Sequence, residues 1–97
     1  MVGWAMFQHA QVIVTEGQPK VYASSDHGRR SICPDCGTGL FYANAVTLPG
    51  IIDIQTSTLD DPEALPPRVQ VQLADRLHWA ETIAALPGYP RYPDMAP

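Results

Sequence analysis

Short apolar runs bounded by turn residues recur along the chain, and two of them alternate with polar residues in the way typical of a β-strand with one wet face. The two cleanest runs are residues 51–58, where isoleucines alternate with polar residues, and residues 68–73, where valines do so. Residues rich in Gly, Pro, Ser and Asp separate the runs and favour turns. The expected strands are residues 4–8, 11–15, 20–23, 29–32, 40–42, 51–58 and 68–73.

Two of these strands are close enough in sequence to form a hairpin. Residues 16–19, Glu-Gly-Gln-Pro, separate residues 11–15 from residues 20–23, and a turn of this composition predicts that the two strands pair. Gly28 ends the next turn, and we expect it to adopt a positive φ. The segment after it then leads directly into Cys33.

Near the C-terminus the pattern changes to a helical period. Trp79, Ile83 and Leu86 recur on one face of residues 78–86, and a Pro-Gly pair follows. Residues 60–63 place an acidic residue before a proline, which predicts a capped helical turn. The expected fold is therefore mainly β, with twisted antiparallel sheets and one short C-terminal helix.

Length and composition indicate one ordinary globular domain spanning residues 1–97. The chain is 45% hydrophobic and 16% charged, and its net charge is −4. It has no cluster of Lys or Arg that could follow a phosphate backbone, so we expect no nucleic-acid partner.

The N-terminus carries no leader pattern, and no apolar run approaches the length that crosses a bilayer. We therefore expect a cytoplasmic protein that does not insert in membranes. Its two cysteines should then be reduced.

The most informative stretch is Cys33-Pro-Asp-Cys36-Gly37. A Cys-x-x-Cys turn places two thiolates on one side at a separation that suits one zinc ion, and the glycine after it supplies a positive φ. Two other interpretations stay open. A thioredoxin-like redox pair would stand at a helix N-terminus, whereas an apolar strand follows here. The pair could also be two thiols without a function.

Tetrahedral zinc takes four ligands, so Cys33 and Cys36 supply only half of a site. His27 lies six residues before Cys33 across an expected turn and could reach the metal. His9 and His78 have no partner nearby in sequence, and we expect them to be surface or packing residues.

Several longer motifs occur in a fixed order along the chain. They are Gly17-Gln-Pro19, Tyr22-Ala-Ser-Ser25, Cys33-Pro-Asp-Cys-Gly-Thr-Gly-Leu-Phe-Tyr42, Thr58-Leu-Asp-Asp-Pro62, Trp79 and the tail 86–93. Together they resemble the glutathione-dependent formaldehyde-activating family, which includes centromere-protein-V-like proteins.

This resemblance implies a β-tent fold and a zinc-dependent carbon–sulfur lyase that joins glutathione to formaldehyde. In the family, a structural zinc is held by an N-terminal Cys-x-Cys and by the pair that corresponds to Cys33 and Cys36. In family members a Cys-x-Cys-x-x-Cys motif holds the catalytic zinc, and it precedes the segment that corresponds to this chain from Trp4 onward. Neither upstream motif occurs in this sequence, so we expect an N-terminally shortened, catalytically incomplete member, and glutathione is a doubtful co-substrate.

Three functions remain open at this point. The chain is a shortened form of an enzyme acting on a small thiol, or a non-catalytic member that binds zinc and self-associates, or a zinc-ribbon interaction module. We expect a two-fold homodimer, because a missing N-terminal segment leaves a sheet edge open and two Cys33–Cys36 pairs could complete a Cys₄ site. We assign no catalytic residue and no substrate-binding residue. Arg29 and Arg30 are interpreted as a solvated edge, and Trp4, Phe7, Phe41, Tyr42 and Trp79 as core.

Overall fold

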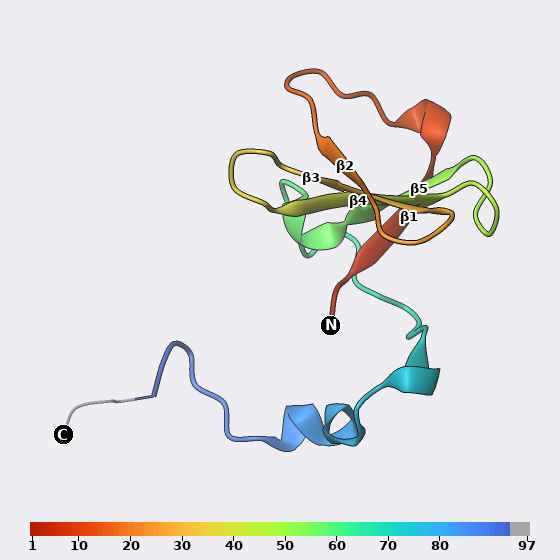
Figure 1. Cartoon of the computed structure of the whole chain (residues 1–97). Helices are drawn as coiled ribbons and strands as arrows, with labels where there is room; N and C mark the ends of the chain where they lie inside the picture. The colour runs from red at the N-terminus through yellow and green to blue at the C-terminus, as the bar shows by residue number, and fades with distance from the viewer. Residues whose placement is uncertain (94–97) are drawn as a thin grey trace.

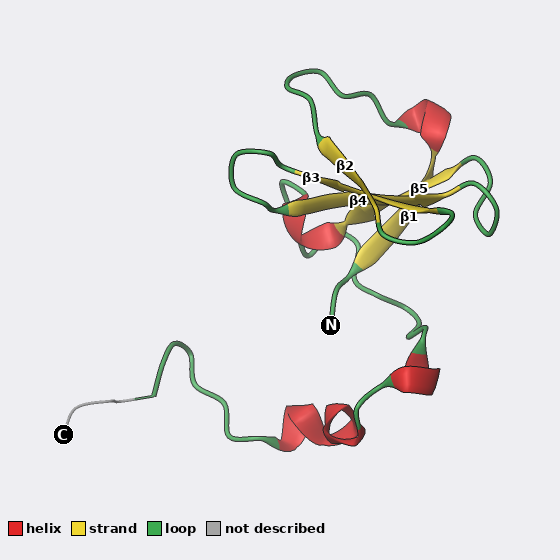
Figure 2. Cartoon of the chain, viewed as in Figure 1, coloured by secondary structure: helices red, strands yellow, loops and turns green. Residues whose placement is uncertain are grey.

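The computed structural model describes residues 1–93, and its centre is one five-stranded antiparallel sheet (Figures 1 and 2). The strands follow one another across the sheet in the order β1-β5-β4-β3-β2, and all four neighbouring pairs are antiparallel. Their bounds are β1 Trp4–Gln8, β2 Lys20–Ala23, β3 Gly28–Ile32, β4 Gly39–Asn44 and β5 Ile51–Gln55. The expected mainly β, antiparallel architecture is confirmed, and β1 and β2 form the two edges.

The helical segments among the described residues are all 3₁₀ helices: η1 His9–Gln11, η2 Thr56–Thr58, η3 Leu73–Asp75 and η4 His78–Ala85. The C-terminal helix expected over residues 78–86 is therefore present as η4. None of these segments is long and apolar enough to cross a membrane. The turn expected at residues 60–63 is also present, because the Glu63 N–H donates to Asp61 Oδ1 at 3.1 Å and the Ala64 N–H donates to the Asp61 carbonyl at 3.1 Å.

The strand expected over residues 11–15 does not form. Gln11 ends η1, and residues 12–19 continue as an irregular loop. The expected hairpin with residues 20–23 is therefore wrong, since β2 pairs with β3 instead. The apolar run has another role: Val12 and Val14 line a hollow together with Phe41 and Ile52 of the sheet, so they cover a sheet face without extending the sheet.

The strand expected over residues 68–73 is also wrong. Val69 and Val71 are exposed, and no strand is assigned in this segment of the described chain. Gln72 has a φ of 59°, a left-handed conformation that interrupts extended backbone directly before η3. The strand expected over residues 51–58 begins at Ile51 as expected, but it ends at Gln55 and η2 follows it.

Residues that are paired across the strands divide the sheet into two faces. One ladder runs through Met6, Asp53, Tyr42, Arg30 and Tyr22, and we call its side the open face. The opposite side, which carries Val21, Ser31, Phe41, Ile52 and Ile54, is the loop face, because residues 12–19 line hollows against it. The arrangement follows from the period of two along each strand.

The core is shallow. Ile52 of β5 is the buried hydrophobic residue, with 8% of its surface exposed. Asn44 at the end of β4 is also buried, and its side-chain oxygen accepts hydrogen bonds from the N–H groups of Val46 at 3.1 Å and Thr47 at 3.0 Å. These bonds order the loop that leads into β5, so the buried polar side chain is satisfied.

Gly28 does not adopt the positive φ that its turn position suggested, since the left-handed glycines are Gly17, Gly37 and Gly50. It begins β3 and is buried. A Cβ atom at this position would lie 2.6 Å from Ser25 Oγ. A larger residue here would displace the Ser25 side chain, whose Oγ accepts a hydrogen bond from the Gly28 N–H at 2.9 Å.

Residues 59–93, which we call the C-terminal arm, extend away from the sheet (Figure 1). Every residue from Asp60 to Tyr92 is exposed except Ala80. Trp79 is 61% exposed, so its interpretation as a core residue is wrong. The Cα radius of gyration is 16.5 Å, whereas a compact chain of this length has about 12.5 Å.

Candidate metal centre

Cys33 and Cys36 lie in the turn that joins β3 to β4. The Cys33 N–H donates to the Thr38 carbonyl at 2.8 Å, and the Gly37 N–H donates to the Cys33 carbonyl at 2.8 Å. Gly37 has a φ of 77°, which an L side chain rarely adopts. Two backbone hydrogen bonds and one left-handed glycine therefore fix the turn that carries both cysteines.

Hydrogen bonds in this turn favour the thiolate of Cys36. Its Sγ lies 3.0 Å from Thr38 Oγ1. Hydrogen bonds from the side chain and backbone of Thr38, and then from the side chain of Cys33, lower the pKa of Cys36, against smaller opposing effects of burial and of Asp35. Both cysteines are free, with Cys33 partly buried and Cys36 exposed. The turn thus presents one activated thiol beside a second one.

A strand follows the turn, as expected, because β4 begins at Gly39. A thioredoxin-like pair depends on the positive end of a helix to lower the pKa of one thiol. Here the lowering comes from hydrogen bonds to Thr38 and Cys33 instead. The cysteine turn therefore differs from a thioredoxin-like pair in the element that follows it.

The structure separates His27 from the cysteine pair. His27 lies in the turn before β3 and Cys33 follows the end of β3, so the five residues of this strand stand between them. At about 3.3 Å per residue the two positions are more than about 15 Å apart. His27 therefore does not reach the turn, because the extended strand β3, which agrees with the strand expected over residues 29–32, lies between them.

No group of three or more His, Cys, Asp or Glu side chains that could hold a metal comes together within residues 1–93. His9 is exposed in η1 and His78 is exposed in η4. The pair Cys33–Cys36 fits a zinc ion in its donor type and its turn, and it supplies two ligands of the four.

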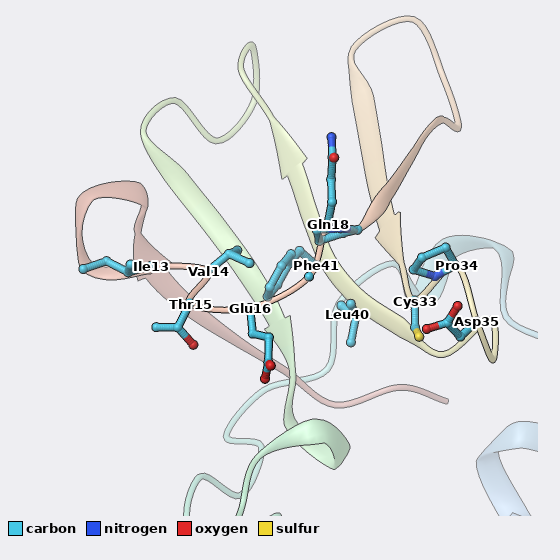
Figure 3. Close-up of a pocket in the computed structure, with 12 residues that line it drawn as sticks. Ile13, Val14, Thr15, Glu16, Gln18, Cys33, Pro34, Asp35, Leu40 and Phe41 are labelled. Atoms are coloured by element: carbon cyan, nitrogen blue, oxygen red, sulfur yellow. The ribbon is translucent and has the colours of Figure 1, made fainter.

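A hollow of about 370 Å³ adjoins the cysteine turn (Figure 3). One wall is the loop at residues 13–19, and the other comprises Leu40 and Phe41 of β4 with Cys33 and its two following residues. A second hollow of about 320 Å³ shares Val14, Gln18, Pro19 and Phe41 with the first. Sequence reasoning missed this feature, because it assigned part of the covering loop to a strand.

The two arginines of β3 have structural contacts. The Arg29 guanidinium donates to the carbonyls of Ser25 at 3.1 Å and Gly28 at 2.8 Å, which closes the turn before β3. The Arg30 guanidinium lies 5.0 Å from the centre of the Tyr42 ring on the open face. Both arginines are exposed, in keeping with a solvated edge.

The model of one protein family, described as glutathione-dependent formaldehyde-activating enzyme, matches residues 1–75. The matched segment contains the whole sheet and the cysteine turn, and it ends within η3. No curated protein and no solved structure matches the chain.

Proposed function

The chain belongs to the glutathione-dependent formaldehyde-activating family, and from this premise we propose that it is a zinc-binding member without carbon–sulfur lyase activity in its 97-residue form. Cys33 and Cys36 are the proposed metal ligands. The proposal places the protein in the cytoplasm, where its thiols stay reduced. It also gives residues 1–97 the arrangement of one β-tent domain, in which zinc fixes the turn between β3 and β4.

The observation that carries the zinc proposal is the cysteine turn itself. Zinc binds thiolates, and the hydrogen bonds from Thr38 and Cys33 that lower the pKa of Cys36 reduce the free energy needed to deprotonate it. The turn is also held by its own backbone hydrogen bonds, which fix the segment that carries both ligands. A zinc ion in this place would tie the end of β3 to the start of β4.

The proposed lack of lyase activity follows from the number of cysteines. A catalytic zinc of the family type uses three thiolates, whereas this chain has two cysteines, both in the turn. A bound zinc polarises a carbonyl or holds a thiolate in such enzymes. A chain without those three ligands cannot provide this chemistry by itself, so glutathione is not proposed as its co-substrate.

Zinc content of the purified protein tests the metal assignment. The wild type is expected to copurify with zinc, and Cys33→Ser and Cys36→Ser are each expected to lose most of it. His27→Ala is the control and should keep the wild-type ratio of zinc to chain, since His27 stands at the far end of β3. A wild type without zinc that also fails to bind added zinc contradicts the assignment.

An activity assay tests the second half of the proposal. Exchange between glutathione, formaldehyde and S-hydroxymethylglutathione is followed by NMR line broadening, with and without added zinc. The rate with the protein is expected to equal the spontaneous rate. A rate well above it that depends on the chain would refute the proposal, whatever the zinc content.

A further inference from the structure

The chain exposes more surface than a folded protein of its mass. Its accessible surface is 8564 Å², whereas a compact monomer of this mass exposes about 5,500 Å². The excess of roughly 3,000 Å² is larger than the approximately 800 Å² that each partner buries in a standard protein interface. Much of it lies on the C-terminal arm, where Trp79 and Leu86 are both more than half exposed.

The outer edge of β1 is open. The Gly3 carbonyl and the His9 N–H both bond toward β5, at 2.9 Å to Thr56 and 2.8 Å to Gly50. Because backbone groups alternate in direction along a strand, the N–H and C=O groups of Trp4, Met6 and Gln8 point away from the sheet. Of these outward groups, within residues 1–93, the Gln8 N–H has a partner, Gln11 Oε1 at 3.0 Å.

The composition of β1 leaves this edge unprotected. Its sequence, Trp-Ala-Met-Phe-Gln, contains no charge and no proline, and Met6 is 61% exposed. Natural edge strands normally carry Lys or Pro, or are very short, and these features prevent them from pairing with another chain. The opposite edge has these features, since β2 is four residues long, begins with Lys20 and follows Pro19. The two edges therefore differ in their readiness to pair.

We propose that a second copy of the chain pairs with β1, antiparallel about a two-fold axis at Met6. In this register the two Met6 residues exchange both backbone hydrogen bonds, and the Trp4 N–H donates to the Gln8 carbonyl of the other copy. Ala5 then faces Phe7 of the other copy on the loop face. The result is a continuous ten-stranded sheet, which goes beyond the zinc-binding role and does not depend on it.

The C-terminal arm begins beside this axis. Thr56, at the end of β5, bonds to Gly3 just before β1, so each arm leaves the sheet next to the new junction. Trp79, Ile83 and Leu86 recur along η4 and its end, and all three are exposed. Laid over the open face of the other copy, these exposed apolar side chains supply the area that two five-residue strands lack.

Zinc takes no part in this contact. Cys33 follows β3, which is separated from β1 by β4 and β5, so about 14 Å lies between the cysteine turn and the edge. A two-fold axis at Met6 sends the two cysteine turns to opposite ends of the joined sheet. The proposed dimer therefore contains no Cys₄ site shared between the copies.

Sedimentation of the full chain at micromolar concentration tests the proposal, with proline variants of the two edges. Met6→Pro removes an N–H group that the isolated sheet does not use, so the fold should persist while the dimer weakens by at least about tenfold. Val21→Pro, whose N–H points outward from β2, is the matched control and should stay dimeric. A chelator should leave the wild-type dimer intact.

Four outcomes overturn the proposal: a monomeric wild type, a Met6→Pro variant that stays dimeric, a Val21→Pro variant that dissociates, and dissociation by the chelator. If Met6→Pro fails to fold, hydrogen exchange of the wild type decides instead. The amides of Trp4 and Met6 should then be protected at high concentration and exchange faster on dilution, whereas Val21 and Ala23 exchange fast throughout. Fast exchange at Met6 at every concentration contradicts pairing at β1.

Discussion

Asp53 is the least satisfied side chain of the sheet. Its Oδ1 is buried and has no hydrogen-bond partner within residues 1–93, and burial raises the pKa of its carboxyl above the ordinary value of 3.8. The strand pattern places it on the open face between Met6 and Tyr42. A charged group in this position opposes folding at neutral pH.

We therefore expect Asp53→Asn to stabilise the protein at neutral pH, by less than about 1 kcal/mol because the side chain is partly exposed. The raised pKa means that the folded chain binds the proton more tightly than the unfolded chain. The contribution of Asp53 to stability thus grows as pH falls through the raised pKa toward 3.8, and it is lost as pH rises.

Thermal unfolding of both forms measures the effect. The measurements run from about pH 3.5 to about pH 7.5, which spans this titration. The Tm advantage of Asp53→Asn should be largest at neutral pH and should shrink in acid. An advantage that is constant across this range, or a variant less stable than wild type at neutral pH, contradicts the assignment.

Gly37 in the cysteine turn permits a second test on a single residue. A Cβ atom at Gly37 would meet open space, so the cost of Gly37→Ala comes from the φ of 77° alone. We expect it to destabilise the chain by about 1 kcal/mol and to weaken zinc binding. Gly88→Ala is the control, because Gly88 has neither a positive φ nor a neighbour within 4 Å. Equal effects of the two substitutions would argue against a strained turn.

The strands of the sheet pack against one another, whereas the C-terminal arm is exposed to solvent. β5 lies between β1 and β4, and Ile52 is buried on the loop face opposite Phe7. Ile52→Ala should cost about 2 kcal/mol, the lower end of the usual range, because the core is shallow. Val71→Ala in the arm should change stability by less than about 0.5 kcal/mol. Urea unfolding measures both, and similar losses would mean that the arm packs against the sheet.

The five strands of the sheet were largely predictable, because short apolar runs between turn residues mark β1 and β2, and β5 adds a clear alternation. The failures at residues 11–15 and 68–73 have one physical cause. An apolar or alternating run has the side-chain pattern of a strand, whereas a strand also needs a hydrogen-bonding partner for its backbone. Residues 12–19 pack over a sheet face, and residues 68–73 have no neighbouring strand in the described chain.

At the candidate metal centre, the cysteine turn and its glycine could be predicted because their determinants are local. Gly37 has the expected positive φ and β4 follows directly. The separation of His27 from the cysteines follows from the strand expected over residues 29–32, so ligation by His27 was inconsistent with that strand. The hollow beside Cys33 depends on the path of the loop at residues 12–19, which no local pattern specifies.

Within residues 1–93 the molecule has little buried surface and an unprotected sheet edge at β1, so its stability should depend on association. A dimer that folds with its interface unfolds at a temperature that rises with protein concentration. We expect the Tm of the wild type to rise over a wide concentration range and the Tm of Met6→Pro to stay constant. Calorimetry at several concentrations measures this, and a wild-type Tm that does not change indicates a self-sufficient monomer.

The pairing of the first strand with the last also has a consequence during synthesis. β1 leaves the ribosome before β2, β3, β4 and β5, and its partner in the sheet is the strand that is made last. At about 5–20 residues per second the residues that separate β1 from β5 take roughly 2–10 s to translate. Throughout that interval an uncharged, apolar strand is available to chaperones and to neighbouring nascent chains on the same messenger RNA. Closing so long a loop is also slow in itself, so refolding yield should fall steeply as the concentration of unfolded chain increases.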